Sequence, residues 1–421
     1  MKMKRWMLSI LFLGSLLLPL AFGTIFAADK ITLEVWHVHN AANSRDGAAM
    51  EEVYREYEKA HPGIKINLNA MTYADLRQKA LVAGQAGQGP DVLHMLVEWV
   101  AEFAKAGIIT DITNWVDEWE DEDKFPESTW QVTRVDGRCY GIPSVASTRL
   151  LLYREDLFKK AGIKAPPKTW SELRAVAKKL ASNNMAGFAF CSATTAIRGP
   201  QEFLVFLWST GAELVKKENG KYVPGFTVEQ VQSVFQLYYD LIFVDKAVPL
   251  YTRGWEWQNL DQAFEAGTVA MCQNGSWMLY RAERAKTGKM WKTAPFPYSK
   301  VPATYLEVKV EGIGAFSKYK KEAWDLLKFV YNKENMARIT KYDNLPSRSD
   351  VMNLPFYTSD PVWKKAFMEV IPTGHTVPPI PLTPILRASM EGVQEVIYER
   401  MKPAEAAKVF YDKVAEYLKT L

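Results

Sequence analysis

Hydrophobic positions along residues 31–106 switch repeatedly between a period of two and a period of 3.6. Ile31, Leu33 and Val35 alternate with polar residues, which predicts a strand that ends at Trp36. The same pattern predicts a helix around 50–57, a strand over 64–68, a helix over 76–84, a strand over 91–97 and a helix over 98–106. Strands that alternate with helices over short loops are typically parallel and joined by right-handed crossovers. We therefore expect an α/β unit in this part of the chain.

The pattern changes near residue 137. Glycine and proline residues interrupt it over 137–143, and the apolar run Leu150–Tyr153 follows. This arrangement predicts that the chain crosses between two lobes and then forms a strand of the second lobe. Farther along, Thr169 and Glu172 form the capping box of a helix. Helical spacing of apolar residues predicts further helices over 231–242, 321–331, 385–401 and 403–421.

The N-terminus has the composition of a secretory signal peptide. Basic residues precede an apolar stretch over 6–26, and candidate cleavage sites follow Gly23 or Ala27. An uncleaved membrane anchor is the alternative, because about 20 apolar residues can span a bilayer. The stretch contains no cysteine, so a lipoprotein anchor is not expected. We expect cleavage of residues 1–28 and a soluble mature chain outside the cytoplasm.

Composition and charge narrow the class of protein. The chain has 421 residues, of which 48% are hydrophobic and 24% are charged, so it can bury a large core and is not a disordered chain. The formal net charge is +4, and it falls to +1 when Lys2, Lys4 and Arg5 are set aside. No nucleic-acid-binding surface is therefore expected.

The cysteines do not suggest a disulfide framework. Cys139, Cys191 and Cys272 are far apart and odd in number. Three buried thiols are the favoured expectation, and a single disulfide bond is the alternative.

A series of short motifs runs nearly the whole length of the mature chain in the order of a known family. The motifs are the strand into Trp36, then Tyr57–Ile64, Gly89–Val92, Gly107–Asp111, Asp136–Pro143, Tyr153–Gly162, Pro167–Leu173, Phe264–Gly267, Asn274–Trp277 and Leu345–Arg348. Each motif alone is a weak signal, whereas the ordered set is specific. On these residues the chain resembles the extracellular solute-binding proteins of bacterial ABC importers, in the large sugar-binding family that includes maltose-binding protein.

The resemblance implies an α/β fold of two lobes, each a central sheet flanked by helices, with a hinge between them. The first lobe would take residues 29–141 and 278–343, and the second residues 142–277 and 344–421. A small-molecule sugar would lie in the cleft, and the lobes would close over it by a hinge motion. The closed form would then meet the membrane permease subunits of the importer. We further expect a periplasmic monomer with no cofactor and no nucleic-acid partner.

A sugar site needs aromatic rings for the C–H faces of the sugar and fixed polar groups for its hydroxyls. An unpaired buried hydroxyl costs about 1–3 kcal/mol. Trp36 and His37 end the first predicted strand, and Glu98 and Trp99 follow a buried strand. Ligands of α/β sheets bind beyond the carboxyl ends of strands, so these four residues are candidate contacts. The alternatives are core packing for the tryptophans and helix N-terminal stabilisation for Glu98.

Other candidates come from loops and from positions that the family uses. Trp255 and Trp257 lie two residues apart in a polar loop with no helical stripe to explain them, and the resemblance places Trp257 in the cleft. The remaining candidate contacts are Arg149, Asn274, Ser276, Trp277, Glu311, Gly312, Arg348 and His375. Glu311 and Gly312 are expected to begin a strand. For Arg149 and Arg348, an ion pair without ligand contact is an equal alternative.

Other kinds of site are less well supported. His37 and His39 have no third ligand near them in the sequence, so no metal site is expected. Gly84–Gly89 lacks the lysine and hydroxyl of a phosphate-binding loop. The resemblance supplies no catalytic carboxylate pair, so neither a secreted glycoside hydrolase nor any other enzyme is expected. Glycerol 3-phosphate or one of its diesters is the alternative ligand, with candidate contacts Arg149, Arg198, Arg253, Arg348 and Arg387.

Overall fold

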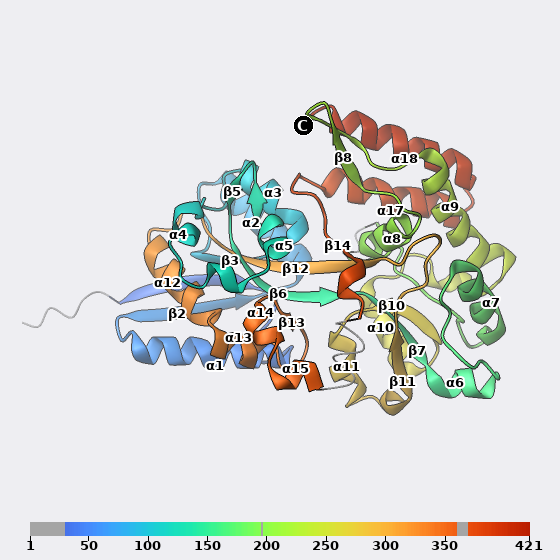
Figure 1. The fold of residues 1–421 in the computed structure, drawn as a ribbon, viewed down its shortest axis with the longest axis horizontal. Coiled ribbons are helices and arrows are strands. Elements are labelled where there is room, and N and C mark those ends of the chain that lie inside the picture. Colours follow the sequence, from blue (N-terminus) through green and yellow to red (C-terminus); the bar gives the residue numbers. More distant parts are fainter. Residues whose placement is uncertain (1–29, 195–196, 360–368) are drawn as a thin grey trace, which may run out of the picture.

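The computed structural model describes residues 30–194, 197–359 and 369–421, which form two lobes that are each built on a sheet (Figure 1). The expected signal peptide, residues 1–28, lies outside the described residues. Across the described ranges, no helix combines the length and the apolar character that crossing a membrane requires.

The first lobe is built on a mixed sheet. Its strands are β1 (Ile31–His37), β2 (Ile64–Ala70), β3 (Val92–Leu96), β6 (Ile142–Thr148), β12 (Thr304–Ile313), β13 (Leu345–Pro346) and β14 (Gly374–His375). They pair in the order β13-β6-β12-β3-β1-β2, and β14 pairs with β12. β1 is parallel to β2 and β3, as the sequence pattern predicts. β12 is antiparallel to β3 and β6, and β13 is antiparallel to β6.

Helices cover both faces of this sheet. They are α1 (Arg45–Ala60), α2 (Tyr73–Gln85), α3 (Val97–Lys105), α12 (Lys320–Val330) and α13 (Lys333–Ile339), with the shorter α4 (Thr113–Asp117), α5 (Glu127–Gln131), α14 (Ser349–Met352) and α15 (Pro355–Ser359). Successive side chains of a strand point to opposite faces, so β1 contributes to two cores. Leu33 and Val35 pack with α1, α12 and α13, whereas Trp36 packs with α2 and α3.

The second lobe is built on three antiparallel strands, in which β7 (Leu150–Arg154) lies between β10 (Met271–Asn274) and β11 (Trp291–Ala294). The lobe boundaries expected from the resemblance differ here, since they place β11 in the first lobe and β6 in the second, whereas β6 pairs within the large sheet of the first lobe. Its helices are α6 (Glu155–Lys160), α7 (Trp170–Leu180), α8 (Arg198–Ser209), α9 (Val228–Tyr239), α10 (Trp257–Ala266), α11 (Trp277–Ala282), α17 (Thr383–Ile397) and α18 (Pro403–Leu418). Every residue of α8 is buried, and α8, α9, α17 and α18 share one core. Two small hairpins are separate from both of these sheets. They are β4 (Arg134–Val135) with β5 (Arg138–Cys139), and β8 (Val215–Glu218) with β9 (Lys221–Pro224).

Several local predictions are confirmed. The apolar run at Leu150 forms β7. Thr169 and Glu172 make the predicted capping box at the start of α7. The three cysteines are free and buried.

The predicted start of a strand at Glu311 is wrong. β12 begins at Thr304, so Glu311 is close to its end. Glu307, Lys309 and Glu311 alternate with apolar residues along this strand, and all three are buried. This alternation is the pattern of a strand with one polar face, and it extends the strand toward the N-terminus from the predicted start at Glu311.

β6 and β12 link the two lobes. Both strands extend from the large sheet toward the second lobe (Figure 1). After β6 the chain passes through Arg149 directly into β7 of the other sheet. Side chains on these two strands can therefore contact both lobes.

Glu202 of α8 is a buried carboxyl group within the second lobe. Its side chain accepts a hydrogen bond from the backbone N–H of Cys191 at 2.9 Å. Burial raises the pKa of Glu202 to about 8, against the lowering effect of Arg198. The folded chain thus holds a proton that the unfolded chain loses at lower pH.

We predict that Glu202→Gln stabilises the protein at about pH 8.5 and stabilises it much less at about pH 5, because stability falls with rising pH wherever the folded state holds the extra proton. Glutamine removes the buried charge and keeps an acceptor for Cys191. Denaturant unfolding at both pH values measures the gain, which cannot exceed about 1.4 kcal/mol per unit of pKa shift. The exposed Glu416→Gln serves as the control. An equal gain at both pH values would contradict this account of Glu202.

Candidate binding site

Side chains from both lobes meet in a buried group that we call the interlobe cluster: Glu98, Arg149, Gln201, Tyr305 and Glu307. Glu98 lies in α3 of the first lobe and Gln201 in α8 of the second. The amide nitrogen of Gln201 donates to Oε1 of Glu98 at 3.0 Å and to Oε1 of Glu307 at 3.1 Å. The amide oxygen of Gln201 accepts a hydrogen bond from Arg149. A single glutamine therefore joins the two lobes.

The two carboxylates of the interlobe cluster have different environments. Burial opposes ionisation of Glu307, but Arg149 and Lys309 outweigh it and lower its pKa to about 2. Burial and the nearby charge of Glu307 raise the pKa of Glu98. Oε1 of Glu98 also accepts a hydrogen bond from the Tyr305 hydroxyl at 2.6 Å. Its Oε2 is buried and has no protein partner, so it can accept a hydrogen bond from a ligand.

Two half-buried tryptophans lie beside the arginines of this region. The guanidinium groups of Arg149 and Arg198 lie 4.9 and 5.2 Å from the ring centroid of Trp277. Arg198 also lies 5.8 Å from the ring centroid of Trp257. Gly275 allows this arrangement, because a Cβ at that position would come within 2.0 Å of the Trp277 ring. The structure thus brings Trp277 close to Arg149 of the interlobe cluster, and Arg198 lies near both tryptophans.

Asn274 and Ser276 flank Gly275 and have protein partners. Asn274 donates to Asp261 at 2.8 Å, and Asp261 pairs with Arg198 at 2.6 Å. The Ser276 hydroxyl donates to the carbonyl oxygen of Asp343, between α13 and β13, at 2.5 Å. Ser276 therefore makes a second contact between the lobes.

A third contact between the lobes involves α2, α3 and α17. Arg77 donates to the Thr383 hydroxyl at 3.1 Å, and this hydroxyl donates to Glu102 at 3.2 Å. Arg77 and Glu102 also form an ion pair at 2.7 Å. In the described part of the chain, these three sets of contacts join the two lobes.

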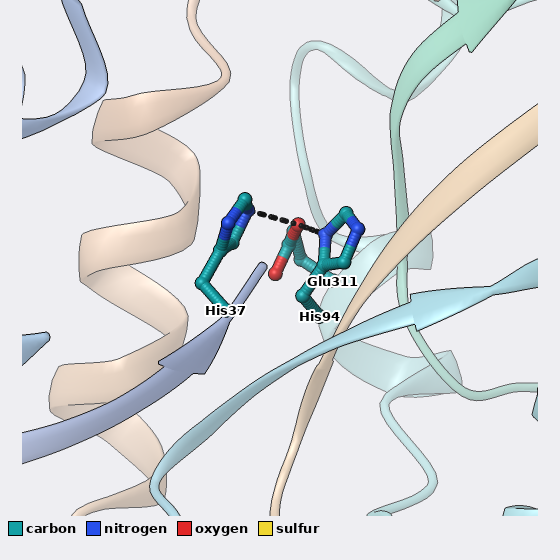
Figure 2. Close-up of side chains that lie close together, drawn as sticks. All are labelled: His37, His94 and Glu311. Atoms are coloured by element: carbon teal, nitrogen blue, oxygen red, sulfur yellow. Dashed lines mark hydrogen bonds and ion pairs between the residues drawn. The ribbon is translucent and has the colours of Figure 1, made fainter. Parts of the chain in front are cut away.

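His37, His94 and Glu311 form a second buried group, which we call the His–Glu cluster. Figure 2 shows both imidazole rings directed at the Glu311 carboxylate. Oε1 of Glu311 lies 2.6 Å from Nδ1 of His94 and 3.4 Å from Nε2 of His37. Burial opposes ionisation of Glu311, but the two histidines lower its pKa to about 2. Potential metal-ligand atoms of these three residues lie within 4.8 Å of one another, a grouping that sequence spacing alone did not reveal.

Three candidates on the first lobe are packed in its interior. Trp36 and Trp99 belong to the core that contacts α2 and α3. The Lys79 amine lies 3.9 Å from the ring centroid of Trp36 and covers it. A Cβ at Gly312 would come within 2.6 Å of the Met95 side chain, so this glycine permits close packing of the sheet.

Three further candidates have contacts apart from the interlobe cluster. Arg348 is buried and forms ion pairs with Asp121 at 2.7 Å and with Asp350 at 3.0 Å. His375 in β14 stacks on Trp208, with ring centroids 5.0 Å apart. Trp255 is half-buried at the edge of the core around α10.

Sequence reasoning missed four residues of these two groups. His94, Gln201, Tyr305 and Glu307 were not among the candidate contacts. The alternation of Glu307, Lys309 and Glu311 with valines was a usable signal, since it is the pattern of a strand with one polar face. No comparable signal marked Gln201, which lies in a wholly buried helix.

Comparison with known proteins agrees with this architecture. The family model of the bacterial extracellular solute-binding protein matches residues 41–337. A relative from Brucella abortus (strain 2308), named as a binding protein, is 26% identical over 345 residues, which are 80% of this chain and 82% of the relative. A maltotriose-binding protein of Pyrococcus abyssi is 23% identical over 406 residues, which are 92% of this chain and 82% of that protein.

Among solved structures, an ABC-transporter solute-binding protein of Thermotoga lettingae bound with α-D-tagatose superposes with a TM-score of 0.84. It is 25% identical, and the match covers 92% of this chain and 100% of the other. Its likeness identifies the two hinged lobes as the periplasmic-binding-protein fold. Because the family model matches well over half of its length, the chain belongs to the bacterial extracellular solute-binding protein family.

Proposed function

We propose that this protein is the solute-binding component of an ABC importer and that it captures a neutral mono- or oligosaccharide between its lobes. The observation that carries the proposal is the interlobe cluster, where Glu98 meets Gln201 of the other lobe and keeps a buried oxygen without a protein partner. A carboxyl oxygen can accept a hydrogen bond from a sugar hydroxyl. A solute that contacts residues of both lobes stabilises the closed arrangement.

The arginines support a neutral ligand over glycerol 3-phosphate, because those proposed for phosphate already have protein partners. Arg149 pairs with Glu307 at 3.2 Å, and Arg198 pairs with Asp261. The other partners are Asp121 and Asp350 for Arg348, Glu391 for Arg387, and the carbonyl oxygens of Leu250 and Ile397 for Arg253. A phosphate would have to break one of these pairs.

The same contacts favour binding over glycoside hydrolysis. Glu98 and Glu307 share the amide of Gln201, and their pKa values move in opposite directions, as in a catalytic carboxylate pair. However, Oε1 of Glu307 faces Arg149 and Gln201, and its Oε2 accepts from Ser147 at 2.8 Å. Glu307 thus presents no free oxygen to a sugar carbon or a water.

The aromatic residues supply the second half of a sugar site. Trp257 and Trp277 are half-buried beside Arg198, and a ring of this kind can stack on the apolar face of a sugar. The tagatose complex and the maltotriose-binding relative are consistent with a carbohydrate ligand. Membership of an extracellular family supports a site of action outside the cytoplasmic membrane, from which a monomer would deliver the solute to the permease.

We predict that Trp277→Ala weakens saccharide binding at least tenfold, because stacking on the indole is lost. A thermal-shift panel of tagatose, maltose, maltotriose and glycerol 3-phosphate identifies a ligand, and calorimetry then gives the two dissociation constants. A ligand at about 100 times its dissociation constant adds about 2.7 kcal/mol to the stability, enough for a shift of a few degrees. Trp115→Ala, at a partly buried ring that packs against the core of the first lobe, should lower stability without changing affinity. A response to glycerol 3-phosphate alone would contradict the proposed ligand class.

We predict that Glu98→Gln weakens binding of the same saccharide by about tenfold, the size of one net hydrogen bond. Glutamine keeps an acceptor for Tyr305 and Gln201 but places an N–H donor where Oε2 of Glu98 lies. Affinity of the unchanged protein should vary little with salt, since the ligand is neutral. The exposed Glu118→Gln in the first lobe is the matched control. If Glu98→Gln binds the saccharide with unchanged affinity, Glu98 does not contact the ligand.

A further inference from the structure

The hydrogen bonds of the His–Glu cluster fix the position of the proton on His37. The backbone N–H of His39 donates to Nδ1 of His37 at 2.8 Å. A backbone N–H can only donate, so Nδ1 of His37 must be the bare nitrogen. Neutral His37 therefore carries its proton on Nε2, the atom that faces Glu311.

The same reasoning fixes the tautomer of His94. Its Nδ1 lies 2.6 Å from Oε1 of Glu311. An ionised carboxylate only accepts hydrogen bonds, so Nδ1 of His94 carries the proton and its Nε2 is the acceptor. Burial lowers the pKa of His94 to about 4, so the ring is neutral near pH 7. Nε2 of His94 is buried and has no protein partner.

His94 lies within β3, close to residues that follow the carboxyl ends of the parallel strands β1 and β2. Its ring centroid is 6.1 Å from that of Tyr73, at the start of α2, and Tyr73 is 6.1 Å from Trp99 in α3. His39, just beyond β1, lies 6.3 Å from His94 and also has an Nε2 without a partner. This is the edge of the sheet at which Glu98 meets the second lobe.

We propose that Nε2 of His94 accepts a hydrogen bond from a hydroxyl of the bound solute, and that Glu311 and His37 are positioning residues that hold His94 in the required tautomer. This inference rests on the proposed function and makes it more specific. A buried acceptor that pairs only with a donor rejects an analogue in which that hydroxyl is missing, because the nitrogen is then left unpaired. His94 would thus contribute to the choice among saccharides.

A metal ion is the competing occupant of the His–Glu cluster, and the hydrogen bonds argue against it. Coordination would take Nδ1 of His94 and Nε2 of His37, so each ring would have to carry its proton on the other nitrogen. His94 can make this change, because its Nε2 has no partner. His37 cannot, because its Nδ1 faces the N–H of His39. The charge of Lys309, which also acts on His94, further disfavours a cation.

The test is His94→Asn, assayed with the saccharide among tagatose, maltose and maltotriose that gives the largest thermal shift. The asparagine amide nitrogen occupies the position of Nδ1 and keeps the donor to Glu311, whereas the acceptor at Nε2 is removed. We expect about tenfold weaker binding, the size of one net hydrogen bond. His61→Asn, at the C-cap of α1, is the matched control and should bind as the unchanged protein does.

Nuclear magnetic resonance of protein labelled with ¹⁵N-histidine reads the tautomers without any ligand. We expect the proton of His94 on Nδ1 and that of His37 on Nε2, and a shift of the His94 Nε2 resonance when the saccharide is added. Three results would overturn the inference even if the unchanged protein binds a saccharide. They are an affinity of His94→Asn equal to that of the unchanged protein, a His94 proton on Nε2, and stoichiometric Zn²⁺ binding that needs Glu311. If the unchanged protein binds no saccharide, the proposed function fails and this inference fails with it.

Discussion

Packing two lobes against each other places ionisable side chains in the protein interior, and the structure depends on how their charges are satisfied. Removing ions from water is costly unless they are paired and hydrogen-bonded. At the interlobe cluster, Gln201 donates to two carboxylates and accepts from Arg149. The amide satisfies one oxygen of each carboxyl group, and the charges of Arg149 and Lys309 stabilise the ionised form of Glu307. Oε2 of Glu98 has no protein partner, and it is the atom at which we propose that a solute hydroxyl binds.

β12 carries this polar arrangement from one lobe toward the other. Glu307, Lys309 and Glu311 share one face of the strand and are all buried. Glu307 belongs to the interlobe cluster, and Glu311 belongs to the His–Glu cluster. Between them, Lys309 contacts Asn344 at 3.1 Å and lowers the pKa values of its neighbours by its charge. A single strand therefore connects the contact between the lobes with the histidines of the first lobe.

The sequence predicts the parts of the fold that depend on local periodicity and turn chemistry. The alternation of Leu33 and Val35 with polar residues yields β1, and Thr169 with Glu172 yields the start of α7. Our prediction began β12 at Glu311 and left out the alternation of Glu307 and Lys309 with apolar residues, which marks the earlier part of the strand. The sequence also leaves open whether Trp36 and Trp99 pack in a core or contact a ligand. Tertiary packing decides this, and it places both residues in a core.

The candidate site is harder to predict because its contacts join distant parts of the chain. His94 and Glu311 are 217 residues apart, and Glu98 and Gln201 are 103 apart. Aromatic residues in glycine-containing loops are visible in the sequence, as Trp257 and Trp277 show. A buried glutamine or histidine becomes recognisable only when its partners are known.

The most direct test of the central claim is a crystal structure of the protein with the saccharide that stabilises it most. The account predicts the sugar between the lobes, with one hydroxyl within hydrogen-bond distance of Oε2 of Glu98 and a ring face against Trp277. A sugar bound elsewhere on the surface, with Glu98 and Gln201 contacting only each other, would contradict it.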